Sequence, residues 1–413
     1  MSAPPAGEKA LGKPRGDAKK AGTQRGQLLL PPLPIQEIGS LPKTLWRLKA
    51  FEKEGIDPAA LDQARKEGKR LGIAEHPDLV TLLEKRKGFS KEEKADIKRW
   101  ASRYSLRYLE EAGLDIVYDG EETRTEMYDW PVARTKGFEE RGWCRSWDHL
   151  YFKKAAIVSP PRCDEPYHTE EYVHATRHGR KQLKVPVTGA YTLMDWSFDE
   201  YYFPKAKGKS TKERRFASRR QFAVDLAKDV LRPNLKALTD AGATRIQVDE
   251  PGASTKPDEV GVFVESFNES VKGLKGRFSI HLCFSEYRLF FPGILDLKGC
   301  SELAIELANK DGWGLGTTAK DRPGYAETLA LWTEHDAPFD IGLGVLDVHT
   351  DRVESPELVR DRVLFAAREL GAERVLVNPD CGLRTRRWPV VEAKLRSLVE
   401  GTRLARKELG LQE

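Results

Sequence analysis

The amino-acid sequence predicts an α/β protein of the (β/α)8, or TIM, barrel class, and two observations support this prediction. From residue 34 onward, short apolar segments typical of β-strands alternate with amphipathic segments typical of helices. The apolar segments number eight, and eight parallel strands that alternate with helices form a closed barrel. The expected strands cover residues 34–40, 114–120, 183–191, 245–250, 278–284, 302–307, 339–348 and 374–380. An open doubly wound sheet is the alternative, but no glycine-rich fingerprint opens a helix after any strand.

The connecting segments carry helical patterns with recognisable ends. Clear examples are residues 219–242, 257–276 and 355–372. In the last of these, Ser355 and Pro356 are placed as the N-cap and the first helical residue, and Gly371 is placed as the C-terminal stop. Helices of this kind are expected to cover the outside of the barrel.

The chain is longer than a simple barrel and should therefore contain insertions. It has 413 residues, whereas a TIM barrel needs about 250. Residues 41–113, after the first strand, read as two or three helices, and residues 121–182, after the second, read as strands and aromatic-rich loops. Length alone also permits two or three domains, but no internal repeat or linker divides residues 31–413.

Charge and cysteine content restrict the classes of function. Residues 1–27 hold six lysines and arginines against two acids, out of a net charge of +5 for the chain. We expect residues 1–30 to form a disordered basic tail, with nucleic-acid or membrane binding by this tail as the less favoured alternative. No segment resembles a membrane span or a secretory signal, so the sequence predicts a cytoplasmic protein with no membrane partner. Five cysteines, an odd number, favour free, catalytic or metal-bound thiols over disulfides.

Four possible metal ligands lie at the expected C-terminal ends of strands, where barrel enzymes build their sites. His281 and Cys283 are two residues apart and share one face of the fifth strand. Glu306 and Cys381 follow the sixth and eighth strands. An imidazole, two thiolates and a carboxylate suit tetrahedral Zn²⁺.

Taken alone, a His-x-Cys pair is more often a buried histidine beside a core thiol, and the convergence with the other two ligands favours a zinc site. The remaining thiols, Cys144, Cys163 and Cys300, have no assigned partner. Asp380, next to Cys381, is expected to orient the turn that presents this thiol. Three arginines that follow, Arg384, Arg386 and Arg387, offset the negative site or meet an anionic donor, unless they are simply solvated surface charge.

Seven motifs in one order resemble the C-terminal catalytic domain of cobalamin-independent methionine synthases. The motifs are EIGSLPKT, IVYDGEETRTEM, VTGAYTLMDWSF, RIQVDEP, IHLCFSE, GLGVLDVHTDRVES and VNPDCGLRTRRW, and the resemblance covers about residues 34–410. It implies that residues 31–413 form a zinc-dependent barrel, an S-methyltransferase that methylates L-homocysteine to L-methionine. The family's zinc ligands match His281, Cys283, Glu306 and Cys381.

The resemblance also implies roles for substrate-binding residues. Ile38, Gly39 and Ser40 match the segment that holds the homocysteine carboxylate. Glu121 and Asp249 match the two acids that bind its ammonium, although structural ion pairs are the alternative. His349 matches the proton donor, and Trp196 matches a tryptophan that lies against the pterin of methyl-folate, although core packing would otherwise explain Trp196.

Two departures from the family pattern leave the methyl donor open. Thr255 stands where the family has an acid that faces the folate, and Tyr151 and Phe152 stand where it has an Arg-Cys pair. The donor is therefore expected to be methyl-tetrahydrofolate, or methylcobalamin or a corrinoid protein. Two other functions remain as alternatives. One is alkylation of another thiol, as in the coenzyme M transferases, and the other is a non-catalytic barrel with a closed zinc site.

Overall fold

The computed structural model describes residues 30–145 and 151–411. The predicted basic tail, residues 1–30, lies outside the described residues except for Leu30. Within the described part of the chain, no helix is long and apolar enough to cross a membrane.

The centre of the molecule is a parallel sheet of six strands. Its order is β5 (Val185–Thr188), β7 (Arg245–Asp249), β8 (Arg277–Leu282), β9 (Cys300–Ile305), β10 (Asp340–Gly344) and β11 (Val375–Asn378). These strands coincide with six of the predicted segments, and nearly all of their residues are buried. Strands covered on both faces read as continuous apolar runs, which explains why the sequence identified them.

The other two predicted strands are reduced to short pairings. The second segment contributes β1 (Ile116–Val117), which pairs in parallel with β4 (Gln182–Leu183), directly before β5. The first segment forms no named strand, and makes isolated bridges from Ile35 to Val377 of β11 and from Gln36 to Ile116 of β1. Proline at position 34 removes one backbone donor, which limits the length of a ladder at that point.

The eight segments nevertheless follow one another around a ring. The Gln36 N–H donates to Val377 O at 2.9 Å, and the Lys184 N–H donates to Val117 O at 3.1 Å. The barrel architecture that the sequence predicts is therefore confirmed. Bridges and single hydrogen bonds, rather than continuous ladders, connect the first two segments to the sheet.

A buried polar network reinforces this closure. The Gln36 Nε2 donates to Glu302 Oε1 at 2.5 Å and to Asn378 Oδ1 at 3.2 Å, while Lys184 Nζ donates to Gln36 Oε1 at 2.9 Å. All four side chains are at most 1% exposed. Side-chain hydrogen bonds thus join the first segment to strands on either side of it and across the ring.

Helices cover the outside of the ring, as predicted. They are α7 (Ala190–Asp195), α8 (Thr211–Leu226), α9 (Arg232–Asp240), α10 (Val260–Val271), α11 (Pro323–Glu334), α12 (Pro356–Leu370) and α13 (Trp388–Glu408). The predicted cap of α12 is confirmed, because Ser355 Oγ accepts from the Leu358 N–H at 3.2 Å. Gly371 ends this helix with φ +91°, a conformation that glycine adopts without strain.

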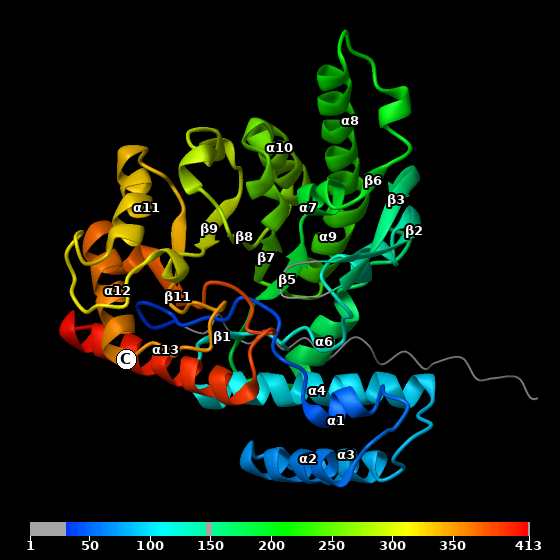
Figure 1. Ribbon diagram of the computed structural model, residues 1–413, viewed down its shortest axis with the longest axis vertical. Coiled ribbons are helices and arrows are strands. Elements are labelled where there is room, and N and C mark those ends of the chain that lie inside the picture. The colour runs from blue at the N-terminus through cyan, green and yellow to red at the C-terminus, as the bar shows by residue number, and fades with distance from the viewer. Residues whose placement is uncertain (1–29, 146–150, 412–413) are drawn as a thin grey trace, which may run out of the picture.

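Both predicted insertions are present, and they lie on different sides of the barrel (Figure 1). The first holds α1 (Leu45–Lys49), α2 (Pro58–Arg70), α3 (His76–Leu83) and α4 (Lys91–Ala112), and α4 packs against α13 and α6 (Thr169–His178). The second holds α5 (Asp129–Val132) and an antiparallel hairpin of β2 (Lys136–Arg145) and β3 (Tyr151–Arg162). A short strand, β6 (Phe198–Asp199), extends this hairpin in parallel with β3.

Candidate functional site

A cavity of about 180 Å³ opens at the C-terminal ends of the strands, and we call it the rim cavity. Every site residue predicted from the sequence lines it except Glu306. These residues are Ile38, Gly39, Ser40, Glu121, Trp196, Asp249, His281, Cys283, His349 and Cys381. The fold therefore brings together side chains that are spread over more than 340 positions of the chain.

Three of the predicted metal ligands form a compact donor group. One ligand atom from each of His281, Cys283 and Cys381 lies within 4.8 Å of the other two. The His281 Nε2 is 3.4 Å from Cys381 Sγ, close to the roughly 3.5 Å that tetrahedral angles and ordinary Zn–N and Zn–S bond lengths would give. The His281 Nδ1 is 3.1 Å from Ala304 O, so Nδ1–H donates there and Nε2 is left to bind a metal. The donor set fits Zn²⁺.

The three donor side chains shift one another's pKa values. A hydrogen bond from Cys283 and the charge of nearby His281 hold the pKa of Cys381 well below its usual range. The same contact with Cys381, together with burial, raises the pKa of Cys283. Burial alone would lower the pKa of His281, but the Cys381 thiolate raises it to about 9. The cavity thus favours the thiolate form of Cys381 and the protonated forms of His281 and Cys283. A divalent cation bound to the three groups can replace those protons.

Glu306, the fourth predicted ligand, is not one of these three donors, and its carboxylate contacts His349 and Phe284. It is fully buried. Its Oε1 is 2.5 Å from His349 Nε2, and its Oε2 accepts from the Phe284 N–H. Although burial opposes it, the hydrogen bond to Glu306 raises the pKa of His349. The backbone N–H of His349 donates to Asp347 Oδ1 at 2.8 Å.

Asp380 fixes the position of the last predicted ligand. Its fully buried carboxylate accepts from the N–H groups of Leu307, Ala308 and Asn309 at 3.0, 2.9 and 2.9 Å. These hydrogen bonds tie the turn that carries Cys381 to the loop that follows Glu306. Outer contacts of this kind orient metal ligands.

The two predicted ammonium-binding acids share one corner of the rim cavity with the first-strand segment. A β-carbon on Gly39 would lie 2.6 Å from Glu121 Oε1, so a side chain at this position would displace the Glu121 carboxylate. Gln247 Nε2 donates to Asp249 Oδ1 at 2.7 Å and to Ile38 O at 2.6 Å. Burial, followed by repulsion from Glu121, raises the pKa of Asp249 to about 7.

Aromatic side chains form two walls of the cavity. Trp196 stacks on Phe152 with ring centroids 5.8 Å apart and planes 28° apart. On another wall, Phe284 lies 4.3 Å from the His349 ring and is half exposed. Phe284 has φ +49°, a left-handed conformation that is unusual for a side chain of this size.

The positions that depart from the family pattern are found apart from one another. Phe152 lines the rim cavity, whereas the Tyr151 side chain is outside the described part of the structure. Thr255 does not line the cavity, and its Oγ1 donates to Asp195 Oδ2 at 3.2 Å.

Several residues with clear contacts in this region were not identified from the sequence. They are Gln247, Glu250, Glu126, Met127 and Phe284. Glu250 follows Asp249 and faces the other way, where its carboxylate accepts from the Tyr191 and Thr192 N–H groups at 3.1 and 2.7 Å. Successive side chains of a strand face opposite ways. This alternation could have predicted that Glu250 faces away from the side that Asp249 occupies.

Comparisons with known proteins agree with this geometry. Residues 79–404 match a family described as the catalytic domain of cobalamin-independent synthases. A methionine synthase of Thermococcus kodakarensis is 35% identical over 381 residues, which are 92% of this chain and 95% of that protein. One from Thermoplasma acidophilum is 37% identical over 313 residues, 72% of this chain and 86% of that protein.

Solved structures show the same fold. A B12-independent methionine synthase from Shewanella sp. W3-18-1, in complex with selenomethionine, superposes with a TM-score of 0.69 at 23% identity, covering 92% of this chain and 99% of that one. A methyltransferase from Methanosarcina mazei superposes with a TM-score of 0.53 at 13% identity, covering 92% and 94%.

Proposed function

The chain belongs to the catalytic-domain family of cobalamin-independent methionine synthases and is a methyltransferase, and from this premise we propose that it methylates the thiolate of L-homocysteine to form L-methionine. Zn²⁺ is the proposed cofactor. The proposed methyl donor is methyl-tetrahydrofolate, or methylcobalamin or a corrinoid protein.

The observation that supports this proposal is the placement of two kinds of site in one cavity. The His281, Cys283 and Cys381 donor group can hold a thiophilic metal. The same cavity is lined by the acids Glu121 and Asp249. A small thiol that also carries an ammonium group matches both halves, and homocysteine is such a molecule.

His281, Cys283 and Cys381 would hold the zinc, with Glu306 as the proposed fourth ligand. Bound zinc would lower the pKa of the substrate thiol and keep its sulfur nucleophilic at neutral pH. Cys381 and its neighbours contribute a negatively charged ligand set, which leaves electron density on the sulfur.

The other residues bind and orient the two substrates. Glu121 and Asp249 are proposed to accept hydrogen bonds from the ammonium, and the backbone of Ile38, Gly39 and Ser40 is proposed to receive the carboxylate. Trp196, with Phe152 behind it, offers a flat apolar face to the methyl donor.

His349 is the proposed proton donor. Glu306 contacts its Nε2 and Asp347 contacts its backbone N–H, so the ring is held at the cavity wall beside Cys381. An imidazole whose pKa is raised keeps its proton to a higher pH than a free imidazole does, and it can deliver that proton to a departing amine.

Zinc-loaded protein should be assayed with L-homocysteine and each donor in parallel. Formation of methionine from methyl-tetrahydrofolate or from methylcobalamin would identify the donor that needs no carrier protein. If neither donor methylates homocysteine while another thiol is alkylated, homocysteine is the wrong acceptor. Cobalt-substituted protein offers a separate check, because its absorption changes when homocysteine enters an open coordination position and stays constant if the site is closed.

A further inference from the structure

Arg384 is the only lysine or arginine among the described residues that line the rim cavity. The carboxyl groups of Glu121, Glu126 and Asp249 line the same cavity. An amino acid brings a further carboxylate into this space, where like charges repel more strongly than in water. The permanently charged guanidinium of Arg384 is therefore the natural counterion.

Arg384 stands on the turn that follows Cys381, beside the first-strand segment. Two residues earlier, a β-carbon on Gly382 would lie 2.8 Å from Ser40 Oγ and 3.1 Å from Ser40 N. The Arg384 Nη2 donates to Thr125 O at 3.2 Å, in the loop that also carries Glu121. Arg384 thus connects the Ser40 corner of the cavity to the loop after β1.

Among the described residues, Arg384 forms no ion pair, although its charge attracts the nearby Glu126 carboxylate and lowers the pKa of that group against the effect of burial. The two arginines that follow it pair with Asp351, Arg386 at 3.1 Å and Arg387 at 3.4 Å. Arg384 forms no ion pair with any carboxylate in residues 30–145 or 151–411. Glu126 is a neighbour, but its Oε2 accepts from the Tyr128 and Asp129 N–H groups at 2.6 and 3.2 Å.

The charge of Arg384 also repels two nearby cations, Lys43 and Arg47. Burial chiefly lowers the pKa of Lys43, and repulsion from Arg47 and Arg384 lowers it further. Lys43 is itself engaged, because its Nζ donates to Gly120 O and Glu121 O at 3.0 and 3.1 Å. Lys43 also pairs with Glu122 at 3.5 Å, whereas Arg384 has no ion pair among the described residues.

We propose that Arg384 binds the carboxylate of the amino-acid substrate beside Ser40, and that it selects thiols that carry a carboxylate. This inference rests on the proposed function, which supplies homocysteine as the acceptor. A guanidinium can give a carboxylate two parallel hydrogen bonds. The ammonium would lie toward Glu121 and Asp249, in the same corner of the cavity, so that neighbouring groups bind the two charges on the substrate α-carbon.

Calorimetric binding to the zinc-loaded protein tests this inference without any methyl donor. Three ligands separate the charges: L-homocysteine, 4-sulfanylbutanoate, which lacks the ammonium, and 3-aminopropane-1-thiol, which lacks the carboxylate. Arg384→Gln should weaken binding of the first two by roughly 10- to 100-fold and change the third by less than about twofold. Arg384→Lys should restore part of the loss, and Arg387→Gln, the matched control, should bind all three ligands as the wild type does.

Three outcomes would overturn the inference. One is an equal loss for all three ligands in Arg384→Gln, and another is no loss for any of them. The third is unchanged binding of these thiols with a raised KM for the methyl donor, which would assign Arg384 to the donor. If the wild type and Arg384→Gln bind homocysteine equally well, the inference fails but the proposed function stands. If the wild type binds none of the three ligands, both the inference and the proposed function are contradicted. Melting temperatures of the variants control for folding.

Discussion

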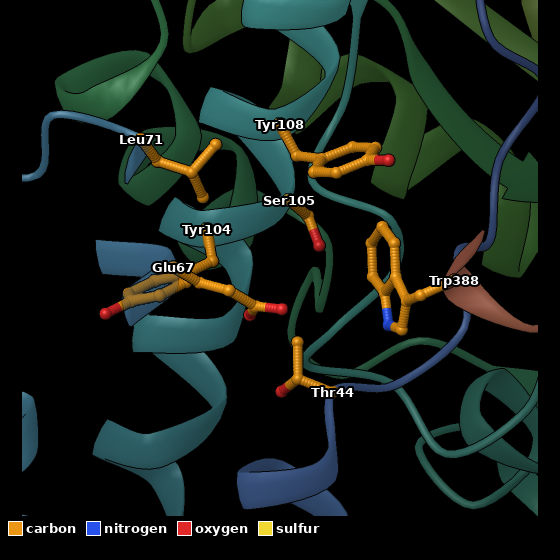
Figure 2. Close-up of a pocket in the computed structure, with 7 residues that line it drawn as sticks. All are labelled: Thr44, Glu67, Leu71, Tyr104, Ser105, Tyr108 and Trp388. Carbon is orange, nitrogen blue, oxygen red and sulfur yellow. The ribbon is translucent and has the colours of Figure 1, made fainter. Parts of the chain in front are cut away.

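The rim cavity and a second, inner cavity show what distinguishes a reactive pocket from a packing defect. The inner cavity has a volume of about 10 Å³ and is lined by Thr44, Glu67, Leu71, Tyr104, Ser105, Tyr108 and Trp388. It lies between the first helical insertion and the start of α13, and Figure 2 shows the Glu67 carboxylate and the Trp388 ring on opposite sides of it.

Both cavities contain a carboxyl group whose pKa burial raises to about 7, Asp249 at the rim and Glu67 inside. The inner cavity is only large enough for about one water molecule. Its polar atoms include Thr44 Oγ1 and Trp388 Nε1, which have no hydrogen-bond partner in the described part of the protein. A shifted pKa alone therefore does not identify an active site. Space for a substrate and several convergent groups are also needed.

The largest expected effect concerns the metal ligands of the rim cavity. Replacing Cys381 by Ser should remove bound zinc and lower methyl transfer by more than about 100-fold, because a hydroxyl is a poor zinc ligand. Metal analysis of the purified variant and a methionine assay measure both effects. Cys300→Ser is the control, since Cys300 begins β9 at the opposite end of the barrel strands. If the Cys381 variant keeps a full complement of zinc, the proposed site is wrong.

The next effect compares the two carboxyl groups directly. Asp249→Asn should raise the KM for homocysteine by roughly 10- to 100-fold, because a charge-assisted hydrogen bond to the ammonium is lost. Glu67→Gln should leave KM and kcat unchanged. Steady-state kinetics with both variants decide the matter, and an unaffected Asp249→Asn enzyme would point to an acceptor without an ammonium group.

The inner carboxyl should instead affect stability as a function of pH. The pKa of Glu67 is 4.5 in an unfolded chain, and burial raises it to about 7 in the folded protein. The folded protein therefore binds more protons between these values, and stability falls as pH rises from about 4.5 to 7. Glu67→Gln should remove this fall. At pH 8 its free energy of unfolding should exceed that of the wild type by about 1–2 kcal/mol, a figure reduced for the partial exposure of Glu67. Equal denaturant midpoints for the two proteins at pH 5 and pH 8 would contradict this account.

The smallest effect tests the content of the inner cavity. Trp388→Phe removes a buried N–H that has no partner among the described residues and keeps an aromatic ring against Tyr108, whose centroid is 4.6 Å away. The free energy of unfolding should change by less than about 1 kcal/mol, because the loss of volume offsets the removal of the unpaired donor. A larger loss would show that the N–H is hydrogen bonded to water in solution.

The sequence predicted the rim cavity well because its parts obey simple periodic rules. His281 and Cys283 share a strand face, and the C-terminal ends of parallel strands meet on one side of a barrel. Most of the strands could be predicted because they are continuous apolar runs. The first segment was predicted as a strand but forms only bridges at Ile35 and Gln36. Its apolar pattern does not show that side-chain hydrogen bonds, rather than a continuous strand ladder, connect it to its neighbours.

Other features depend on contacts between distant residues and could not be predicted. The link that Gln247 makes between Ile38 and Asp249 joins the first segment to the end of β7. The left-handed backbone at Phe284 has no marker such as glycine or asparagine. The inner cavity depends on how α2, α4 and α13 pack, which residue spacing within each helix does not determine.

The turn that Asp380 holds in place carries the last donor of the metal-binding group to be synthesised. The turn that carries Cys381 lies 100 residues after His281, and the strand before it also pairs with the opening segment, where Gln36 N–H meets Val377 O. The donor group can therefore assemble only after the ribosome has released the chain as far as Cys381. Contacts of such long sequence separation form late, and ion binding draws on the free energy of the folded state. Binding of the proposed zinc would then follow the synthesis of β11, and a nascent chain that stops before β11 would lack one of the three donors.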